Sequence, residues 1–398
     1  MGGFSKEGLG RMHSVMAAHV ERGNLPGLVT LLSRGNEVHA DAIGRMAFGD
    51  ATPMQRDTLF RIASMTKPVS GAAAMMLVED GKLSLDEPVD RLLPELANRK
   101  VLKRLDGPLD DTVPANRPIL VSDLLTLRMG MGAIFTMEPY PILKAMAELG
   151  VAVGPQLPKA PSGDDWIRKL GSLPLMKQPG EVWMYDTGII VLGVLLERAS
   201  GQPLEAFYRE RIFEPLGMKD TGFSVPAEKL ARLTTSYMRN PATEKIEIFD
   251  AAGQESRFSR PPGFPAANGG LVSTADDYLA FARMMLNKGE YGGKRLLSER
   301  SVELMTTDHI TPQQKAASPF SPGFWDKRGW GYCLSVIHRH EPGDPRGFGW
   351  DGGYGTSSYW DPETGLIGVL LTQRMMDSPT APPAFVDFWR SAYEAVEA

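Results

Sequence analysis

The first candidate for chemistry is a serine followed three residues later by a lysine, Ser64 and Lys67. Residues three apart lie one turn from each other on the same face of a helix, so the two side chains can meet. A serine hydroxyl is a weak nucleophile that needs a base within hydrogen-bond reach. A lysine can be that base when burial or a nearby cation lowers its pKa. The spacing therefore indicates nucleophilic catalysis, although it is expected about once by chance in a chain of this length.

Two further stretches contain residues that could act with this pair. Tyr185 follows the sequence Pro-Gly-Glu-Val-Trp-Met and precedes an apolar run that favours a helix. Its phenol could share a proton with Ser64 and Lys67, or its ring could simply pack with the hydroxyl in water. The glycine-rich stretch 348–355 enters a predicted strand, where glycines allow a substrate to approach the backbone closely. A tight turn is the alternative for that stretch.

Together, the three stretches resemble the serine β-lactamase and penicillin-binding-protein superfamily, and specifically the class C β-lactamase-like esterases called family VIII. Residues 64–67 match the Ser-x-x-Lys signature, and Tyr185 stands where the second motif has its tyrosine. Residues 350–352, Trp-Asp-Gly, stand where these esterases commonly have Trp-x-Gly. Supporting stretches that also resemble the family lie at 121–126, 213–218 and 269–274.

The resemblance implies a two-step acyl transfer that uses no metal and no organic cofactor. Ser64 would attack an ester carbonyl while Lys67 and Tyr185 together remove its proton and then protonate the leaving alkoxide. The backbone N–H groups of Ser64 and Gly353 would form the oxyanion hole, and water would then release the acyl group. Strongly coupled groups titrate as a unit, so the base is not assigned to either partner alone.

Two positions depart from the β-lactamase pattern and bear on the substrate. Thr187 replaces the amide of Tyr-x-Asn that would hold a lactam side chain, and Trp350 replaces the cation of Lys-Thr-Gly. A neutral aromatic side chain suits an uncharged ester better than the carboxylate of a β-lactam. We therefore expect a small ester with a short acyl group, contacted by Trp350, Asp351, Gly352 and Thr187. Specificity is expected to come from the helical part of the chain and from the loop 136–161.

The chain is rich in predicted strands at both ends and mostly helical between them, and these elements must position the residues above. Apolar periodicity predicts a helix at each terminus, over 9–20 and from 384 onward. It also predicts a buried helix that follows Ser64 and extends to residue 78. Alternating or β-rich runs predict a hairpin near the N-terminus and three strands near the C-terminus, at 28–32, 38–43, 331–336, 357–360 and 366–372. Strand signals are sparse between residues 84 and 262.

This distribution predicts an α+β fold of the class C β-lactamase type. One antiparallel sheet, built from residues 1–80 and 265–398 and flanked by the terminal helices, would carry an inserted, mostly helical domain over 81–264. The active site would lie in the cleft between the two parts.

Composition excludes several other classes of protein. The chain has 398 residues, 43 Lys and Arg against 48 Asp and Glu, and a net charge of −5, which gives no basic surface for nucleic acid or an anionic membrane. Its longest apolar runs are about half the ~20 residues of a bilayer span. The N-terminus lacks the apolar core of a secretion signal, so a cytoplasmic protein is expected. Cys333 is expected to be a small buried apolar residue. The sequence does not determine the oligomeric state.

Several alternatives remain at this stage. A Ser-His-Asp hydrolase is disfavoured because the chain has no Gly-x-Ser-x-Gly elbow. His338 and His340 could pair on a metal, but solvated edge residues are the better interpretation. Within the same chemistry, an acyltransferase, an amide hydrolase or a weak β-lactamase stays open, because the acceptor is not visible in sequence. A penicillin-binding sensor that acylates without turnover is the alternative from another class.

Overall fold

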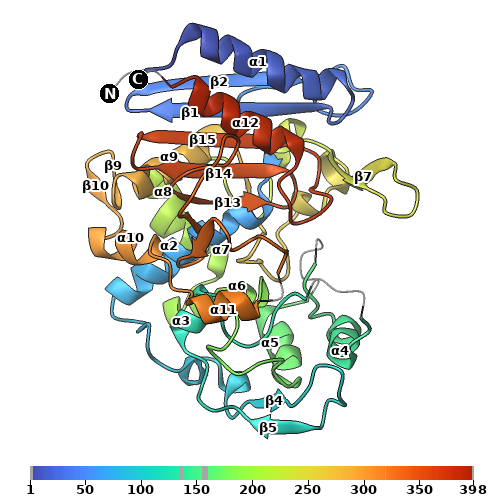
Figure 1. Ribbon diagram of the computed structural model, residues 1–398, viewed down its shortest axis with the longest axis vertical. Coiled ribbons are helices and arrows are strands. Elements are labelled where there is room, and N and C mark those ends of the chain that lie inside the picture. The colour runs from blue at the N-terminus through green and yellow to red at the C-terminus, as the bar shows by residue number, and fades with distance from the viewer. Residues whose placement is uncertain (1–2, 135–137, 155–159, 319, 397–398) are drawn as a thin grey trace.

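The main element of the computed structural model is a seven-stranded antiparallel sheet built from both ends of the chain (Figure 1). The structure describes residues 3–134, 138–154, 160–318 and 320–396. From one edge to the other, the strands are β11 (Arg328–Trp330), β12 (Ser335–Ile337), β13 (Phe348–Gly352), β14 (Thr356–Asp361), β15 (Leu366–Thr372), β1 (Gly27–Arg34) and β2 (Glu37–Gly44).

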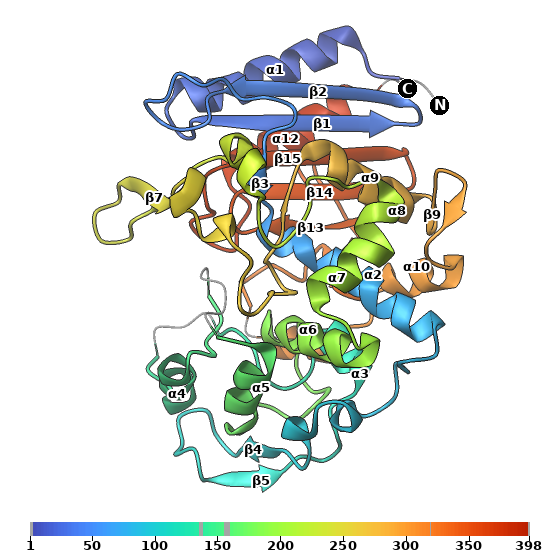
Figure 2. The same ribbon diagram turned by 180° about the vertical axis from the view of Figure 1, so that it is seen from behind.

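Helices cover both faces of this sheet. Side chains alternate along β1, so that Leu28 and Leu32 pack with α1 (Lys6–Glu21) and α12 (Pro383–Glu394), whereas Val29 lies in the main core with α9 (Ala275–Leu286). The view from behind shows α9 on the face opposite α12 (Figure 2). The expected sheet with flanking terminal helices is confirmed.

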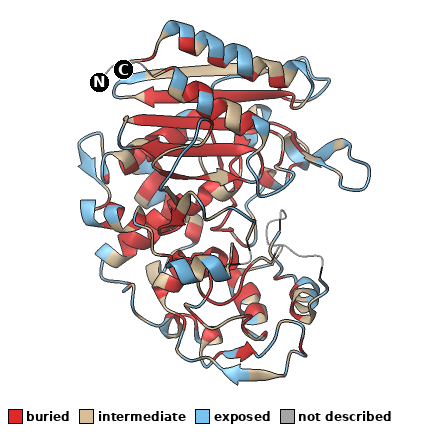
Figure 3. Ribbon diagram, in the orientation of Figure 1, coloured by how far each residue is buried: buried red, intermediate tan, exposed pale blue. Residues whose placement is uncertain are grey.

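Helix α2 (Thr66–Glu79) extends from the sheet toward the helical part of the molecule (Figure 2). Twelve of its residues, Thr66 through Leu77, are buried, and Figure 3 shows the same burial along its length. A helix that is apolar on all sides is stable only inside a large core. The alanine- and methionine-rich sequence therefore makes α2 the rigid base on which the candidate site is built.

The helical part lies on the far side of α2 from the sheet (Figure 1). Its core is α6 (Thr187–Ser200), against which α2, α3 (Val121–Leu125) and α5 (Gly163–Gly171) pack. Helix α4 (Pro141–Leu149) packs on α5, and β4 (Lys100–Leu102) pairs with β5 (Thr112–Pro114). Of the loop 136–161, residues 136, 137 and 155–159 lie outside the described residues.

The remaining elements are short. They are β3 (Phe60–Arg61) paired with β8 (Val272–Ser273), β6 (Ser236–Arg239) paired with β7 (Ile246–Asp250), β9 (Glu290–Tyr291) paired with β10 (Lys294–Arg295), α7 (Leu204–Tyr208), α8 (Glu214–Leu216), α10 (Glu299–Met305) and α11 (Pro312–Ala317). Among the described residues, every helix is too short or too polar to cross a membrane.

The structure differs from the sequence-based expectation at two hairpins. The single strand expected over 331–336 is wrong: residues 331–334 form the turn between β11 and β12, and Cys333 there has a φ of 65°. The hairpin β6–β7 was not expected at all. Tyr237 N–H donates to Gln373 O at 2.7 Å, so this hairpin of the segment 81–264 lies beside the sheet. The division of the chain at residue 264 stays a prediction.

Candidate active site

Ser64 lies where strand β3 turns into the buried helix α2. A single turn of 3-10 helix, Ala63–Met65, joins the two elements, and Ile62 N–H fixes its start by donating to Leu271 O at 3.0 Å. Ala63 has a φ of 45°, a left-handed conformation that costs an alanine of order 1–3 kcal/mol. Such strain persists where the surrounding structure imposes it, as the β3–β8 pairing does here. The turn leaves Ser64 only half-buried beside fully buried neighbours.

Two side chains meet the hydroxyl oxygen of Ser64. Lys67 Nζ lies 3.0 Å from Ser64 Oγ, and Tyr185 Oη also lies 3.0 Å from it. Lys67 comes from the next turn of α2, as the three-residue spacing predicts. Tyr185 comes from the loop before α6, 121 residues further along the chain. The structure thus brings together the three side chains that the sequence singled out.

Lys67 is a fully buried lysine with acceptors on three sides. Besides Ser64 Oγ, Nζ faces the backbone oxygen of Asn268 at 2.7 Å and Oδ1 of Asp186 at 2.7 Å. Burial opposes the ammonium form, but the Asp186 carboxylate and Tyr185 outweigh it and hold the pKa of Lys67 above its ordinary value. The carboxylate of Asp186 therefore favours the charged form of Lys67.

Asp186 and Asn268 were not anticipated from the sequence. Asn268 Nδ2 donates to Asp186 Oδ2 at 2.8 Å, which leaves the other carboxylate oxygen for Lys67. A carboxylate directly after Tyr185 was the available signal for Asp186. Asn268 gave no signal, because it meets Lys67 through a backbone carbonyl that any residue type supplies.

A strained turn presents Tyr185 and Asp186 to the same centre. Asp186 has φ 86° and ψ −57°, and Thr187 N–H donates to Tyr185 O at 3.3 Å. These values define a γ-turn of the rare positive-φ kind. The turn points the two consecutive side chains at Ser64 and Lys67, respectively, at the start of α6.

The phenol oxygen of Tyr185 has a second fixed neighbour, the indole of Trp350. Trp350 Nε1 donates to Tyr185 Oη at 2.8 Å. Lys67 Nζ lies 4.6 Å from the centre of the tyrosine ring, and Trp183 stacks against the ring at 5.6 Å. These contacts hold the phenol oxygen between a serine hydroxyl and an indole N–H, where a negative charge on that oxygen is stabilised.

Replacing Trp350 with phenylalanine should therefore lower kcat by about 3- to 10-fold. The change keeps an aromatic ring and removes one hydrogen bond to Tyr185 Oη, and one such bond contributes about 0.5–1.5 kcal/mol. The matched control is Trp325→Phe, since Trp325 Nε1 is buried without a hydrogen-bond partner among the described residues. Steady-state rates on an ester would check both variants, and equal losses would show that the indole N–H of Trp350 has no special role.

The end of β13 passes close to the turn that carries Ser64. A Cβ atom on Gly352 would lie 2.3 Å from Ile62 O, so only glycine fits there. Next to it, a Cβ atom on Gly353 would meet no heavy atom of the described residues within 4 Å. The backbone at Gly353 thus borders open space on this side. Its N–H as partner of the Ser64 N–H in an oxyanion hole stays a prediction.

Two residues expected to contact substrate are not brought to this centre. The side chain of Asp351 lies on the face of β13 opposite Trp350, where Ser357 Oγ donates to it at 2.6 Å. Burial there raises the pKa of the Asp351 carboxyl. Thr187 is fully buried at the start of α6. Substrate contact by the side chains of Asp351 and Thr187 stays a prediction with no geometric support.

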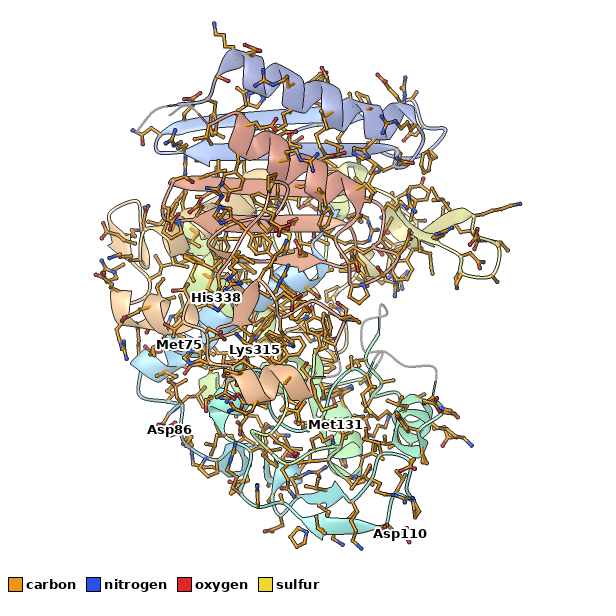
Figure 4. The ribbon with its side chains drawn as sticks, in the orientation of Figure 1. Met75, Asp86, Asp110, Met131, Lys315 and His338 are labelled. Carbon is orange, nitrogen blue, oxygen red and sulfur yellow. The ribbon has the colours of Figure 1, made fainter. Side chains whose placement is uncertain are left out.

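His338 belongs to a separate polar cluster around Asp308. His338 Nε2 lies 2.9 Å from Asp308 Oδ2, and Lys315 Nζ lies 2.5 Å from the same oxygen (Figure 4). His340 is exposed. Within the described parts of the chain, no group of three His, Cys, Asp or Glu side chains could hold a metal ion. Cys333 is buried, as expected, and burial raises the pKa of its thiol.

Comparison with known proteins places this geometry in a family. The family described as Beta-lactamase matches residues 12–386. Protein Rv1367c of Mycobacterium tuberculosis is 42% identical over 365 residues, covering 90% of this chain and 88% of that protein. Esterase EstB of Burkholderia gladioli is 30% identical over 396 residues, covering 94% and 92%. The solved structure of EstCE1, described as a hydrolase with promiscuous acyltransferase activity, superposes with a TM-score of 0.79 at 25% identity, covering 97% and 98%.

The chain therefore belongs to the β-lactamase family of serine hydrolases. Within it, the chain is a family VIII carboxylesterase, a carboxylic ester hydrolase with the class C β-lactamase-like fold.

Proposed function

We propose that this protein hydrolyses short-acyl carboxylic esters through an acyl-enzyme on Ser64, with Lys67 and Tyr185 as its general base and acid. The observation that carries the proposal is the convergence of Lys67 Nζ and Tyr185 Oη on Ser64 Oγ, each at 3.0 Å. The EstB relative, an esterase, supports the same reaction class. A nucleophile with its proton acceptor in hydrogen-bond reach is what covalent catalysis requires.

The first half-reaction transfers the acyl group to the enzyme. The proton of Ser64 passes to the Lys67–Tyr185 pair as Oγ bonds to the carbonyl carbon, and the carbonyl oxygen becomes an oxyanion facing the N–H groups of Ser64 and Gly353. The bond to the alkoxy oxygen then breaks, and the pair returns the proton to that alkoxide. In the second half-reaction water replaces the alcohol, and the proton returns to Ser64 Oγ.

The substrate that suits this site is a small, uncharged ester. Trp350 stands at the position of a cation in the β-lactamases and uses its one donor on Tyr185. The buried Lys67 is neutralised by Asp186, so its charge is not offered to a substrate carboxylate. A β-lactam anion therefore lacks a countercharge here, whereas a neutral ester needs none.

Transfer of the acyl group to an alcohol is the second candidate function. Its support is the EstCE1 structure, whose description names promiscuous acyltransferase activity. The acyl-enzyme is common to both reactions, and only the second acceptor differs. Adding butanol to the assay would therefore yield butyl butyrate from an acyltransferase and butyric acid from a hydrolase.

The proposal is tested by trapping the acyl-enzyme. After incubation with p-nitrophenyl butyrate and acid quenching, the peptide that contains Ser64 should gain the mass of one butyryl group. The matched control is Ser70→Ala. This change removes a hydroxyl of α2 that donates to Ala267 O at 2.6 Å, and the variant should still be labelled on Ser64. A butyryl group on another residue would contradict the proposal. Labelling without product release would instead indicate a non-turnover sensor.

A further inference from the structure

A half-buried pair of aromatic rings borders the candidate active site and has no part in the proposed proton transfer. Phe320 and Phe324 lie in the segment 320–325, between α11 and β11, with their ring centres 4.6 Å apart. The ring of Phe320 lies 5.4 Å from that of Tyr185, and the ring of Phe324 lies 6.1 Å from that of Trp350. The pair thus adjoins both aromatic side chains that meet at the phenol oxygen.

The segment 320–325 is held in place by a fully buried indole, that of Trp183. The ring of Trp183 contacts that of Phe320 at 5.2 Å and that of Phe324 at 5.6 Å. Ser318 Oγ donates to Trp183 O at 3.1 Å just before the segment, and β11 pairs in the sheet just after it. Phe320 and Phe324 are only half-buried, so part of each ring stays accessible. An apolar surface that is fixed in this way can receive a ligand without reorganising.

The position of these rings matches the alcohol side of an ester. In the proposed reaction the leaving alkoxy oxygen takes a proton from the Lys67–Tyr185 pair, so it must come within hydrogen-bond reach of one of the two. Lys67 is fully buried whereas Tyr185 is half-buried, so the phenol is the member that a substrate reaches. The carbon group attached to that oxygen then lies beside the ring of Tyr185, next to Phe320.

The cations around the rings favour a neutral alcohol over a cationic one. Aromatic rings can bind an ammonium group through their faces, but two of these rings already have a cation over them. Lys67 Nζ lies 4.6 Å from the centre of the Tyr185 ring, and the guanidinium carbon of Arg328 lies 4.9 Å from the centre of the Phe324 ring. A cationic ligand therefore gains little there. A neutral aromatic ring instead adds an edge-to-face contact of the kind that Phe320 and Phe324 already make, at an interplanar angle of 64°.

We propose that Phe320 and Phe324 bind the alcohol part of the substrate, and that the substrates are short-acyl esters of a neutral aromatic alcohol. The inference rests on the proposed function and deepens it by naming the substrate class. The ring of the alcohol lies against the two phenylalanines as its alkoxy oxygen meets Tyr185 Oη. Both residues determine specificity, and neither takes part in the proton transfer. They lie outside the helical part of the chain and outside the loop 136–161.

The test compares two butyrate esters whose alcohols differ only in the ring, benzyl butyrate and cyclohexylmethyl butyrate. Both give the same butyryl-enzyme and release an unactivated primary alcohol, so the ratio of their kcat/KM values reports recognition of the alcohol ring. The wild type should prefer the benzyl ester by about 3- to 10-fold, the size of an aromatic contact. Because both esters compete for the same active enzyme, the ratio does not depend on how much of a preparation is folded.

The test variants are Phe320→Leu and Phe324→Leu, which keep an apolar side chain and remove the ring. Each should bring the benzyl-to-cyclohexylmethyl ratio close to 1. The control is Phe48→Leu, which should keep the wild-type ratio, because Phe48 is 41% exposed and its ring contacts that of Tyr237 at 5.0 Å. The ratio of kcat/KM for p-nitrophenyl acetate and p-nitrophenyl butyrate, which share an alcohol, should be the same in all four proteins.

Three results would overturn the proposal. A wild type without a benzyl preference, or an unchanged ratio in both test variants, would show that the two rings do not contact the alcohol. A change in the acetate-to-butyrate ratio would show that the rings contact the acyl group instead. Stronger inhibition by tetramethylammonium ion than by benzyl alcohol would show that the rings bind a cation.

Failure of the proposed function gives a different result. If the wild type hydrolyses none of these esters, the esterase reaction itself fails, and binding of the alcohol is measured without turnover. Titration of 4-fluorobenzyl alcohol, followed by its ¹⁹F resonance, should then give a Kd about 3- to 10-fold higher for Phe320→Leu and Phe324→Leu than for the wild type and Phe48→Leu. Equal Kd values in all four proteins would contradict binding of the alcohol by these two rings.

Discussion

Replacing Ser64 with alanine is expected to lower kcat/KM for p-nitrophenyl butyrate by about 10⁶-fold, the order of the loss in kcat found when a serine nucleophile is removed. The loss is this large because Lys67 and Tyr185 both converge on Ser64 Oγ and have no other nucleophile to activate. Stability should change little, since Ser64 is half-buried and its hydroxyl bonds only within the site. Initial rates at saturating and subsaturating ester would measure the effect.

The Ser64→Ala prediction has a control in α2, the helix that follows the turn of Ser64. Ser70→Ala removes a hydroxyl that bonds Tyr208 and Ala267 O in the core and should leave kcat/KM within a few-fold of the wild type. Ester hydrolysis that survives in Ser64→Ala would mean that another group attacks the carbonyl, whatever the fold. Equal losses in both variants would indicate damage to α2 rather than removal of the nucleophile.

Local spacing predicts part of this site, because it depends on one helix. Ser64 and Lys67 are three residues apart, and any helix that begins at this point brings them together. Tyr185 was placed by resemblance to a family, since no local rule joins residues 121 positions apart. Substrate contact by Trp350 stays a prediction. The structure adds a hydrogen bond from its N–H to Tyr185, a contact between a strand and a loop that only the tertiary structure determines.

The misjudged elements share a physical cause, which is weak local signal. Strand β7 was missed although its residues alternate, because it is five residues long and Ile248 is 61% exposed. The turn at 331–334 was interpreted as strand because Cys333 has no preference for its positive φ. Long apolar elements such as α2 and β15 were recognised, since burial on several sides demands a continuous apolar sequence.

Replacing Arg61 with alanine is expected to lower the free energy of unfolding by about 3–5 kcal/mol, the cost of breaking a buried ion pair. Arg61 lies on β3, three residues before Ser64, and its side chain is 1% exposed. Its Nε donates to Asp250 Oδ2 at 2.6 Å, and its other nitrogens donate to Thr234 O at 2.6 Å and Ser256 Oγ at 3.0 Å. The substitution removes the buried cation beside the Asp250 carboxylate and the Arg61 donor to the Thr234 carbonyl.

The matched control is the exposed ion pair between Arg56 and Asp276. Its nitrogen–oxygen distance, 2.7 Å, is similar to that of the Arg61–Asp250 pair, but its side chains are 52% and 45% exposed. Such pairs contribute about 0–1 kcal/mol, so Arg56→Ala should cost no more than that. Urea unfolding of the two variants at pH 7 would measure the difference, and equal costs would show that burial does not strengthen the Arg61–Asp250 pair.

The cost of Arg61→Ala should also depend on pH. Burial opposes ionisation of Asp250, but Arg61 together with the hydrogen bonds from Arg257 N–H and Ser256 Oγ outweighs it and holds the pKa of this carboxyl below its ordinary value. A depressed pKa contributes stability above the unfolded-state pKa and loses it as the pH falls through the folded-state pKa. In the variant the carboxylate keeps hydrogen bonds from Ser256 Oγ at 2.8 Å and from Arg257 N–H at 3.0 Å, but the nearest remaining cation is the Arg257 side chain at 3.5 Å, so it protonates more easily. The stability difference between wild type and variant should therefore shrink below about pH 4.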